Sequence, residues 1–505
     1  MDSSSKRKST LMIAVATLTA ASIAVVLLRL IPLGIPGVWV VPFSENRSWH
    51  RLPEVFLVLG IILLLTGIVV RKLQTCRWYE EAVSVAMLVL FALWFQFAAG
   101  ALGVDGQNEP FFAVVAPQIA NPYFEASGGI EDPLQYLRDY REIASDSEHY
   151  QLKTHPPGPV MFFYAIRRVA GVPAVENAVL GAVDRLFPES RNQEELSHLE
   201  FVEKLDRSTR AAGWLSIFVL RLAGVLTIVP VYVLARMHYD RVAGFIAAAF
   251  SMLIPSMVVF SPLMDQLYPV IGMTALLLAY AAVSRQKIVL NLAAGLVIFA
   301  GMFFSVSFIM FIPLVVLIQG WMLFASKSIV EYSGAARRLM LMVEMLLIGM
   351  MLGAVAVYAV SRVTIVGMWL NILKVNSEFN LNEGRGYFAW LPLNMIFFAA
   401  FLGVPAAVLY TVRLAREGRV MLARRISEID IMPVAVFAVL AALWLYGANR
   451  GEVERLWMPL MPVCAIAAAG RLNLPHRMLL VLLALQGVQA IAFRLGLNTL
   501  FNLNL

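Results

Sequence analysis

The sequence predicts an all-α protein built as a bundle of about thirteen membrane-spanning helices. Of its 505 residues, 60% are hydrophobic and only 14% are charged, and the mean hydropathy is +0.76. Soluble domains contain roughly 45–50% apolar and about 25% charged residues. A soluble core of this length could not bury so much apolar surface, so we expect lipid to surround most of the chain.

Apolar runs long enough to approach the roughly 20 residues of a membrane span recur along the whole sequence. We expect spans near residues 11–31, 53–70, 82–103, 211–235, 242–261, 267–284, 289–306, 307–326, 340–361, 389–412, 431–447, 456–470 and 478–497. Two of these runs adjoin, and we expect a tight turn near Ser305–Ser307 to separate them. The first run follows a short basic segment without a small-residue cleavage site, which favours a membrane helix over a signal peptide.

The distribution of lysine and arginine predicts the orientation of these spans. If the N-terminus is cytoplasmic, every short inner segment is basic, as the positive-inside tendency requires. The inner basic residues are Lys6, Arg7, Lys8, Arg71, Lys72, Arg77, Arg236, Arg241, Arg285, Lys287, Lys327, Arg337, Arg338, Arg413, Arg416, Arg419, Arg424, Arg425, Arg471 and Arg477. The net charge of +7 is spread over these segments and forms no nucleic-acid-binding face. The two cysteines, Cys76 and Cys464, provide neither a disulfide framework nor a thiolate metal site.

The longer segments all fall on the opposite, outer side, at 32–52, 104–210, 262–266, 362–388 and 448–455. Within the longest of them, helical spacing at Asp132–Ile143 and Val160–Val172 indicates helices lying along the membrane surface. The charged stretch Glu189–Arg210 is typical of a solvated helical insertion. The segment Trp369–Trp390 is rich in asparagine and is compatible with a lid over a lipid-facing groove.

A proline-rich motif, Thr154-His155-Pro156-Pro157-Gly158-Pro159, precedes an apolar aromatic stretch in the longest outer segment. Each proline restricts the residue before it to extended conformations and removes a backbone donor. We expect a stiff elbow that holds His155 at the start of a helix. A helix-start signal with an incidental histidine explains the same pattern.

Two further polar groups lie at the outer ends of apolar runs. The segment Asn449-Arg450-Gly451-Glu452-Val453-Glu454-Arg455 places arginines where they can bind a phosphate, with glutamates to orient them; a mutually paired turn is the alternative. Asp265, in Ser261–Pro269, is costly at the edge of a span unless it faces a cavity or a partner. It can pair with Arg450 or His155, hold an acceptor, or cap the following helix.

The His-Pro-Pro element after an acidic and aromatic outer segment resembles the polytopic glycosyltransferases of the GT-C fold, among them the protein O-mannosyltransferases and the aminoarabinose-lipid A transferases. The stretch Asn121–Tyr140 is similar to the first outer loop of those enzymes, and the Arg-Gly-Glu and Arg-x-Trp elements of 450–457 resemble their C-terminal loop. The resemblance implies a GT-C-like bundle. It divides the chain into a two-helix segment (1–81), a catalytic membrane module (82–388) and C-terminal spans (389–505).

The resemblance also implies a catalytic carboxylate soon after the run 82–103. Asp105 and Glu109 match by position, and Glu125, Asp132 and Asp139 follow in the same segment. The paired acids of the family pattern are missing, which leaves the base open among Asp105, Glu125 and Asp139, with Asp105 ranked first. His155, Asp265, Arg450, Glu452 and Arg455 are then the expected donor-phosphate or substrate ligands.

The expected function is transfer of a sugar from a polyprenyl-phosphate-linked donor to a lipid, glycan or protein acceptor on the non-cytoplasmic face of a bacterial inner or plasma membrane. No metal-binding or cofactor motif stands out, so a metal-independent reaction without a cofactor is expected. A transporter or flippase for a lipid-linked or small solute is the main alternative, and a non-catalytic scaffold is the third. Transporters place charges inside spans, whereas Arg221 and Glu344 are among the few ionisable residues within the runs.

Overall fold

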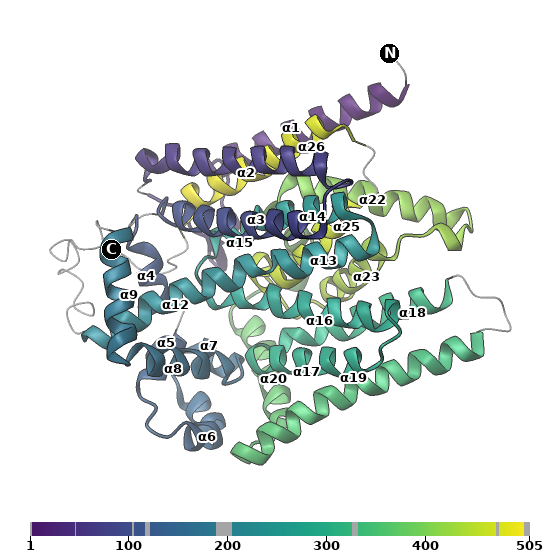
Figure 1. The fold of residues 1–505 in the computed structure, drawn as a ribbon. Helices are drawn as coiled ribbons and strands as arrows, with labels where there is room; N and C mark the ends of the chain where they lie inside the picture. The colour runs from purple at the N-terminus through teal and green to yellow at the C-terminus, as the bar shows by residue number, and fades with distance from the viewer. Residues whose placement is uncertain are drawn as a thin grey trace.

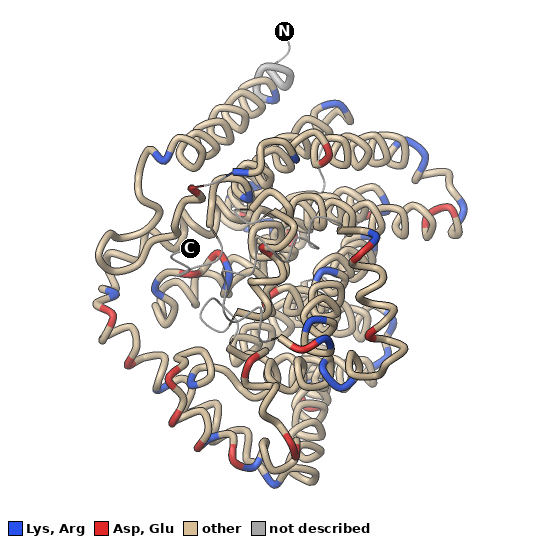
Figure 2. Tube along the Cα trace, turned by 90° about the vertical axis from the view of Figure 1, so that its left-hand side faces the viewer, with Lys and Arg blue, Asp and Glu red and all other residues tan. Residues whose placement is uncertain are grey.

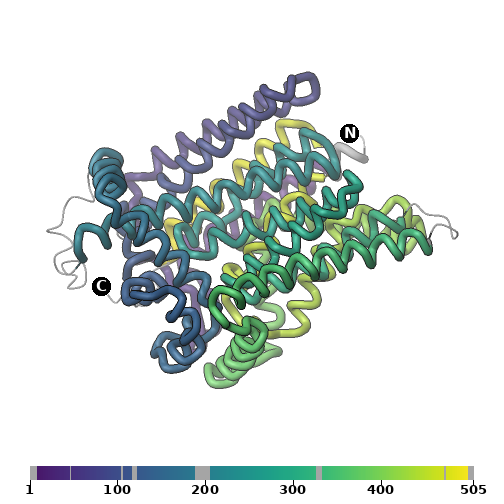
Figure 3. The backbone as a smooth tube through the Cα atoms, turned by 60° about the horizontal axis from the view of Figure 1, so that its bottom comes forward, coloured from purple at the N-terminus to yellow at the C-terminus, as the bar shows by residue number. Residues whose placement is uncertain are grey.

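A computed structural model describes residues 3–45, 47–103, 106–116, 122–187, 205–325, 332–470 and 474–498, and it confirms the predicted all-helical fold class. The helices of the bundle run side by side (Figures 1 and 3). The described part of the chain contains a single two-stranded antiparallel sheet, formed by β1 (Leu33–Ile35) and β2 (Trp39–Val41). The molecule is therefore a helical bundle with one short hairpin.

Eight helical segments in the described residues are long and apolar enough to cross a membrane. They comprise α1 (Ser3–Leu27), α2 (Leu52–Lys72), α3 (Trp78–Gly100), the pair α12 (Arg207–Leu226) and α13 (Ile228–His238), α16 (Leu267–Ser284), α18 (Phe311–Phe324), α19 (Tyr332–Ser361) and α26 (His476–Gly496). A ninth candidate is the bent pair of α20 (Ile365–Asn382) and α21 (Tyr387–Leu402), whose axes differ by 106°. Large apolar side chains such as Leu64, Leu90 and Met351 are more than half exposed on these helices, as lipid-facing residues are.

The expected number of about thirteen full-length spans is higher than the eight or nine that these helices provide. Each of the thirteen apolar runs does correspond to helix, but four of the helical segments have only 10–17 residues. They are α14 (Arg241–Met252), α17 (Val289–Phe304), α23 (Ile431–Tyr446) and the segment Met458–Ala469, which contains α25 (Met461–Ala469). Backbone breaks that a hydropathy window does not register shorten the helices. Pro255 follows α14 and begins α15 (Pro255–Val259), and Gly403, at φ 97°, separates α21 from α22 (Val404–Leu422).

The expected turn between the two adjoining runs is confirmed. Helix α17 ends at Phe304, and Ser305 adopts extended angles (φ −152°, ψ 130°) before the short 3-10 helix η4 (Val306–Met310). The Ser305 hydroxyl accepts a hydrogen bond from the Ser307 backbone N–H at 3.3 Å. This turn carries both serines to the wall of the cavity described below.

Helices α17 and α19 pack closely against each other at glycine residues. A Cβ atom added at Gly295 would lie 2.0 Å from the Leu346 carbonyl oxygen, and one added at Gly349 would lie 2.1 Å from that of Leu292. Small residues allow such backbone contact between membrane helices, where van der Waals packing supplies much of the association energy. The same region is joined by buried amides, because Asn291 donates to the Met342 carbonyl at 2.6 Å and Gln319 donates to Asn291 at 2.6 Å.

The segment between α3 and α12 folds into short helices at one end of the bundle, on the left of Figure 1. These are α4 (Glu109–Val115), α5 (Pro122–Gly128), α6 (Pro133–Asp146), α7 (Tyr150–Thr154), α8 (Gly158–Ala170) and α9 (Pro173–Leu186). Both helices expected in this segment are present, as α6, capped by the Asp132 side chain, and α8. Most of the charged stretch Glu189–Arg210 lies outside the described residues, and α12 begins at Arg207.

The opposite end of the bundle carries the N-terminus and the end of α22 (Figure 1). Figure 2 shows that most residues along the chain are neither basic nor acidic.

Several of the basic residues expected on the inner side form ion pairs. Glu81 contacts Arg236 at 2.6 Å and Arg241 at 3.1 Å, and Arg413 contacts Asp430 at 2.6 Å. The pairs of Glu81 join helices that are distant in the sequence, since Glu81 is on α3, Arg236 on α13 and Arg241 on α14.

The predicted division at residues 81 and 388 stays a prediction. Helices α1 and α2 both pack against α26, so the two ends of the sequence meet in one bundle. The hairpin continues this association, because Phe43 pairs with Leu497 through an isolated β-bridge.

Candidate functional site

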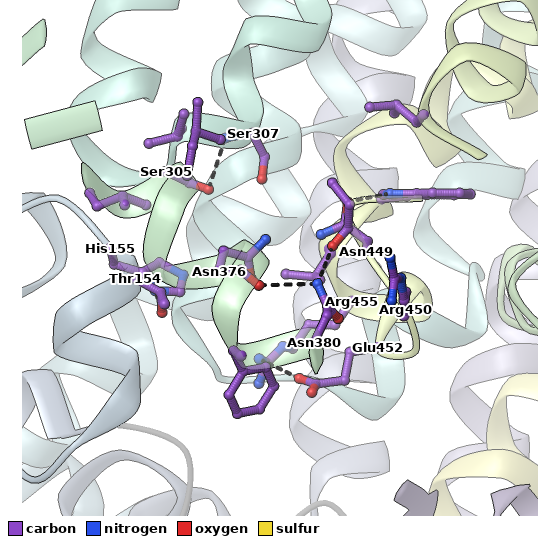
Figure 4. A pocket seen from close by; sticks show the side chains of 18 of the residues that line it. Thr154, His155, Ser305, Ser307, Asn376, Asn380, Asn449, Arg450, Glu452 and Arg455 are labelled. Carbon is purple, nitrogen blue, oxygen red and sulfur yellow. Dashed lines mark hydrogen bonds and ion pairs between the residues drawn. The ribbon is translucent and has the colours of Figure 1, made fainter. Parts of the chain in front are cut away.

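A cavity of about 410 Å³ lies where three segments meet: α7 with the following elbow, η4 with α20, and the turn before α24 (Val453–Leu456). Its polar lining consists of Tyr150, Gln151, Thr154, His155, Ser305, Ser307, Asn376, Asn380, Arg385, Asn449, Arg450, Glu452 and Arg455. Figure 4 shows His155 and Thr154 on one side, Arg450, Glu452 and Arg455 on the other, and Asn376 between them. Four of the expected site residues, His155, Arg450, Glu452 and Arg455, therefore line one cavity.

The proline elbow has the expected extended geometry. His155 has φ −125° and ψ 150°, and α8 begins at Gly158 directly after the two prolines. Gly158 allows the elbow to pack directly on the end of α17, because an added Cβ would lie 2.3 Å from the Phe303 carbonyl oxygen. The Tyr140 hydroxyl donates to the His155 carbonyl at 2.9 Å, which fixes the elbow to α6.

The imidazole of His155 is held as a neutral acceptor. Its Nδ1 lies 3.0 Å from the Gln151 carbonyl oxygen, and since a carbonyl only accepts, Nδ1 carries the proton and Nε2 keeps a lone pair. Burial, followed by the nearby Arg455 charge, lowers the pKa of His155 from 6.5 to about 4. The side chain is therefore uncharged at neutral pH and can accept a proton or a hydrogen bond.

The turn 447–452 places the acidic and basic groups of the opposite wall. Gly447, Gly451 and Glu452 all have positive φ values of 62°, 85° and 58°. Glu452 is the exceptional residue, because a side chain in the left-handed region costs energy that the surrounding contacts must offset. Its carboxylate receives hydrogen bonds from Arg385 at 3.1 Å and from Arg455 at 3.1 Å.

Polar side chains of the bent pair α20–α21 hold this turn. Arg385 donates to the Arg450 carbonyl at 2.9 Å, and Arg450 donates back to the Arg385 carbonyl at 2.8 Å. Asn394 donates to the Asn449 carbonyl at 2.8 Å and accepts from the Gly451 N–H at 3.1 Å. The mutually paired turn is thus observed, and the 106° bend between α20 and α21 supplies its partners.

Arg455 links the cavity to Asp265. Its Nε lies 3.8 Å from the Asp265 carboxylate, and both side chains are less than a fifth exposed. Burial alone would lower the pKa of Arg455, but the charges of Asp265 and Glu452 raise it above the usual arginine value. Asp265 does not line the cavity and lies behind the guanidinium, where it fixes the position of a permanent cation.

The sequence grouped Glu454 with Glu452 as a residue that orients the arginines, and the structure separates the two glutamates. The side chain of Glu454 is 1% exposed, and burial raises its pKa from 4.5 to about 8. Its backbone carbonyl accepts a hydrogen bond from the Ser256 hydroxyl of α15. A neutral carboxyl group therefore lies under the turn at neutral pH. The sequence could not distinguish the roles of Glu454 and Glu452, because both are acidic residues of one motif. They differ in how deeply the fold buries their side chains.

The two candidate bases that the structure describes, Glu125 and Asp139, lie apart from the expected substrate ligands. Asp105 lies outside the described residues. Glu125, on α5, is half-exposed and lies 3.6 Å from His149, and Asp139, on α6, accepts a hydrogen bond from Gln135 at 2.7 Å in an exposed position. Neither Glu125 nor Asp139 lines the cavity. Glu109, the other positional match, is buried and paired with Arg494 at 2.9 Å.

The mouth of the cavity is apolar and exposed. Ile309, Leu373 and Tyr446 line it and are 50%, 42% and 75% exposed. Such side chains at the surface of a membrane bundle are expected to contact lipid. Among the described residues, no group of three or more histidine, cysteine, aspartate or glutamate side chains is arranged to hold a metal ion.

Neither a scan of protein families nor a search of curated proteins finds a match to this sequence. Among solved structures, the chain is similar to the oligosaccharyltransferase of Archaeoglobus fulgidus, whose crystal structure is a complex with zinc and sulfate. The two are 14% identical with a TM-score of 0.40, over 81% of this chain and 53% of that chain. The chain thus spans about half the length of the solved structure.

Proposed function

We propose that this protein is a membrane glycosyltransferase that moves a sugar from a polyprenyl-phosphate-linked donor to a lipid, glycan or protein acceptor on the non-cytoplasmic face. The observation that carries the proposal is a polar cavity lined by three arginines, Arg385, Arg450 and Arg455, whose mouth is lined by exposed apolar side chains. A ligand with an anionic head and a hydrocarbon chain is complementary to both parts. The resemblance of the His-Pro-Pro and Arg-Gly-Glu elements to GT-C enzymes supports the same reading.

In this proposal, Arg450 and Arg455 stabilise the departing phosphate. Charge developing on a leaving phosphate is best stabilised by donors that are already oriented, because no reorganisation is then needed during the reaction. Arg455 is oriented by Glu452 and Asp265, and Arg450 by two backbone carbonyls. Asn376 and Asn380 offer amide groups for sugar hydroxyls from α20.

Activation of the acceptor requires a base near the nucleophile. We propose Asp105, Glu125 or Asp139 for this role, with Asp105 first. Neutral His155 can accept a hydrogen bond from the acceptor or from a donor-sugar hydroxyl through Nε2. No step in this scheme draws on a metal ion or a cofactor.

The proposal is tested with purified protein, radiolabelled polyprenyl-phosphate sugars and membrane acceptors. We expect Arg455→Gln and the variant of the true base, among Asp105→Asn, Glu125→Gln and Asp139→Asn, to lower transfer by about 100-fold or more. Glu142→Gln, which removes an exposed α6 carboxylate that does not line the cavity, is the matched control and should transfer normally. Unchanged transfer in all four test variants would show that the site is wrong. Movement of donor lipid across the membrane without sugar transfer would instead identify a flippase.

A further inference from the structure

A second cavity of about 480 Å³ is lined by residues other than those of the first. It is formed by α2, α3, α4, α9 and α12, and much of its lining is aromatic. The lining comprises Trp94, Phe97, Phe187, Trp214 and Phe218, with Leu90, Leu93, Ala98, Ala101, Pro110 and Leu186 and the polar residues Glu54, Gln107 and Arg221. It shares no lining residue with the first cavity.

Arg221 lies in the inner wall of this cavity with its charge uncompensated by a direct partner. The side chain is 2% exposed, forms no ion pair with any described residue, and its Nη2 has no hydrogen-bond partner there. Nε donates to the Ser261 hydroxyl at 3.3 Å, and the guanidinium lies 4.4 Å from the centre of the Phe97 ring. These contacts leave a full positive charge within a membrane-spanning helix, which is costly without an anion.

Among the described residues, the charges that act on Arg221 are those of Arg494 and Glu109, which pair with each other at 2.9 Å. This described group therefore holds two guanidiniums and one carboxylate, and the pair does not neutralise Arg221. The arginines approach α3 closely because its end lacks side chains: a Cβ at Gly100 would lie 2.0 Å from Arg221 Nη2, and one at Gly103 would lie 2.6 Å from Arg494 Nη2. The sequence thus provides space for a buried cation.

The outer part of the cavity is suited to hydrocarbon. Trp94, Leu90 and Leu186 line it and are 40%, 60% and 60% exposed, so it opens onto apolar surface. Glu54 is exposed among the lining residues and accepts a weak hydrogen bond from Trp94 at 3.4 Å. A carboxylate there repels a free anion, whereas an anion carried on a hydrocarbon chain gains apolar contacts on the way to Arg221.

We infer that this second cavity binds an amphiphile with an anionic head group, whose phosphate or carboxylate pairs with Arg221 and whose hydrocarbon chain lies among Trp94, Phe97 and Phe218. The inference does not depend on the proposed transferase activity. It treats the cavity as a lipid site separate from the donor cavity, and it explains an arginine that the proposed reaction does not use.

The test uses native mass spectrometry of the full-length protein with dioleoyl phosphatidic acid, oleate and uncharged dioleoylglycerol. Wild type should bind phosphatidic acid and oleate at least about tenfold more tightly than dioleoylglycerol, as expected for one charge-assisted contact. Arg221→Gln should abolish this preference, and Arg221→Lys should retain most of it. Arg285→Gln, which removes an exposed charge, is the matched control and should bind like wild type.

Three results would overturn the inference. The first is equal binding of dioleoylglycerol and phosphatidic acid by wild type. The second is an unchanged preference in Arg221→Gln. The third is displacement of phosphatidic acid by millimolar inorganic phosphate, which would identify a site for a free anion. Wild type alone decides the head-group comparison, so the test holds even if Arg221→Gln does not fold.

Discussion

His155 shows how a local motif and a tertiary contact combine at the scale of a residue. The two prolines fix its backbone, but the charge of its ring is decided by burial and by Arg455, which lies more than 290 positions away in the sequence. An exposed histidine in the same motif would titrate near pH 6.5.

His155 should make stability depend on pH below neutrality. The folded protein keeps the ring neutral down to about pH 4, whereas the unfolded chain protonates it near 6.5, so the unfolded state binds more protons between these values. The stability due to this residue is therefore present above pH 6.5 and is lost as the pH falls towards 4. Thermal unfolding in detergent should show wild type losing more stability than His155→Gln over this range, and parallel curves would contradict it.

Glu454 should produce the opposite dependence. Its folded pKa, about 8, is above the unfolded value of 4.5, so the folded state binds more protons between pH 4.5 and 8. Its contribution is fully present below pH 4.5 and is lost as the pH rises through 8. Glu454→Gln resembles the neutral acid, so its melting temperature should match that of wild type at low pH and exceed it increasingly up to pH 9. A constant difference would show that Glu454 is ionised in the folded protein.

At the scale of elements, the break between α20 and α21 organises the candidate site. Arg385 lies in this break, is 6% exposed and reaches both the Arg450 carbonyl and the Glu452 carboxylate. The turn 447–452 has three residues with positive φ, and it depends on such contacts because its own backbone geometry is unfavourable.

Replacing Arg385 should therefore weaken both the fold and the site. We expect Arg385→Gln to cost about 2 kcal/mol, less than for a fully buried pair because Glu452 is partly exposed, and to lower transfer because Glu452 no longer orients Arg455. Lys374→Gln, which removes an exposed surface pair with Glu378, should change stability by less than about 0.5 kcal/mol. Equal melting temperatures for the two variants would show that the turn is held by other contacts.

At the scale of the whole molecule, the helices α4–α9 lie at one end of the bundle, whereas the N-terminus and the end of α22 lie at the other (Figure 1). The positive-inside pattern predicts that the long outer segment and the basic inner segments lie on opposite sides of the membrane. The two ends of the chain share a helical layer, because α1 and α2 pack on α26. The orientation of this bundle in a membrane stays a prediction that labelling can test.

The native thiols provide this test. Cys76 is partly exposed after α2, whereas Cys464 is buried in α25. An impermeant thiol reagent should label Cys76 only from the cytoplasmic side, in inside-out vesicles, and an added Glu383→Cys thiol only from the other side. Labelling of both thiols from one side would contradict the topology. As a control, labelling of the denatured protein measures the total number of reactive thiols.

The sequence by itself determined the fold class, the regions that form helix and the extended elbow at His155, because these depend on composition and on local backbone restrictions. It also marked Arg450, Glu452 and Arg455 as one group, since they are neighbours in the chain. The base could not be selected from spacing, because Asp105, Glu125 and Asp139 differ only in their surroundings.

Only the tertiary structure decided which apolar runs are full-length helices, because single prolines and glycines break helices without changing the average hydropathy. It likewise decided that His155 and Arg455 face one cavity, that Asp265 lies behind Arg455, and that Glu454 is buried while Glu452 is not. Such facts depend on contacts between residues far apart in the chain, and the free energy of a charge is set by those neighbours. The same reason explains Arg221, which the sequence shows only as an arginine within an apolar run and the fold places in a second cavity.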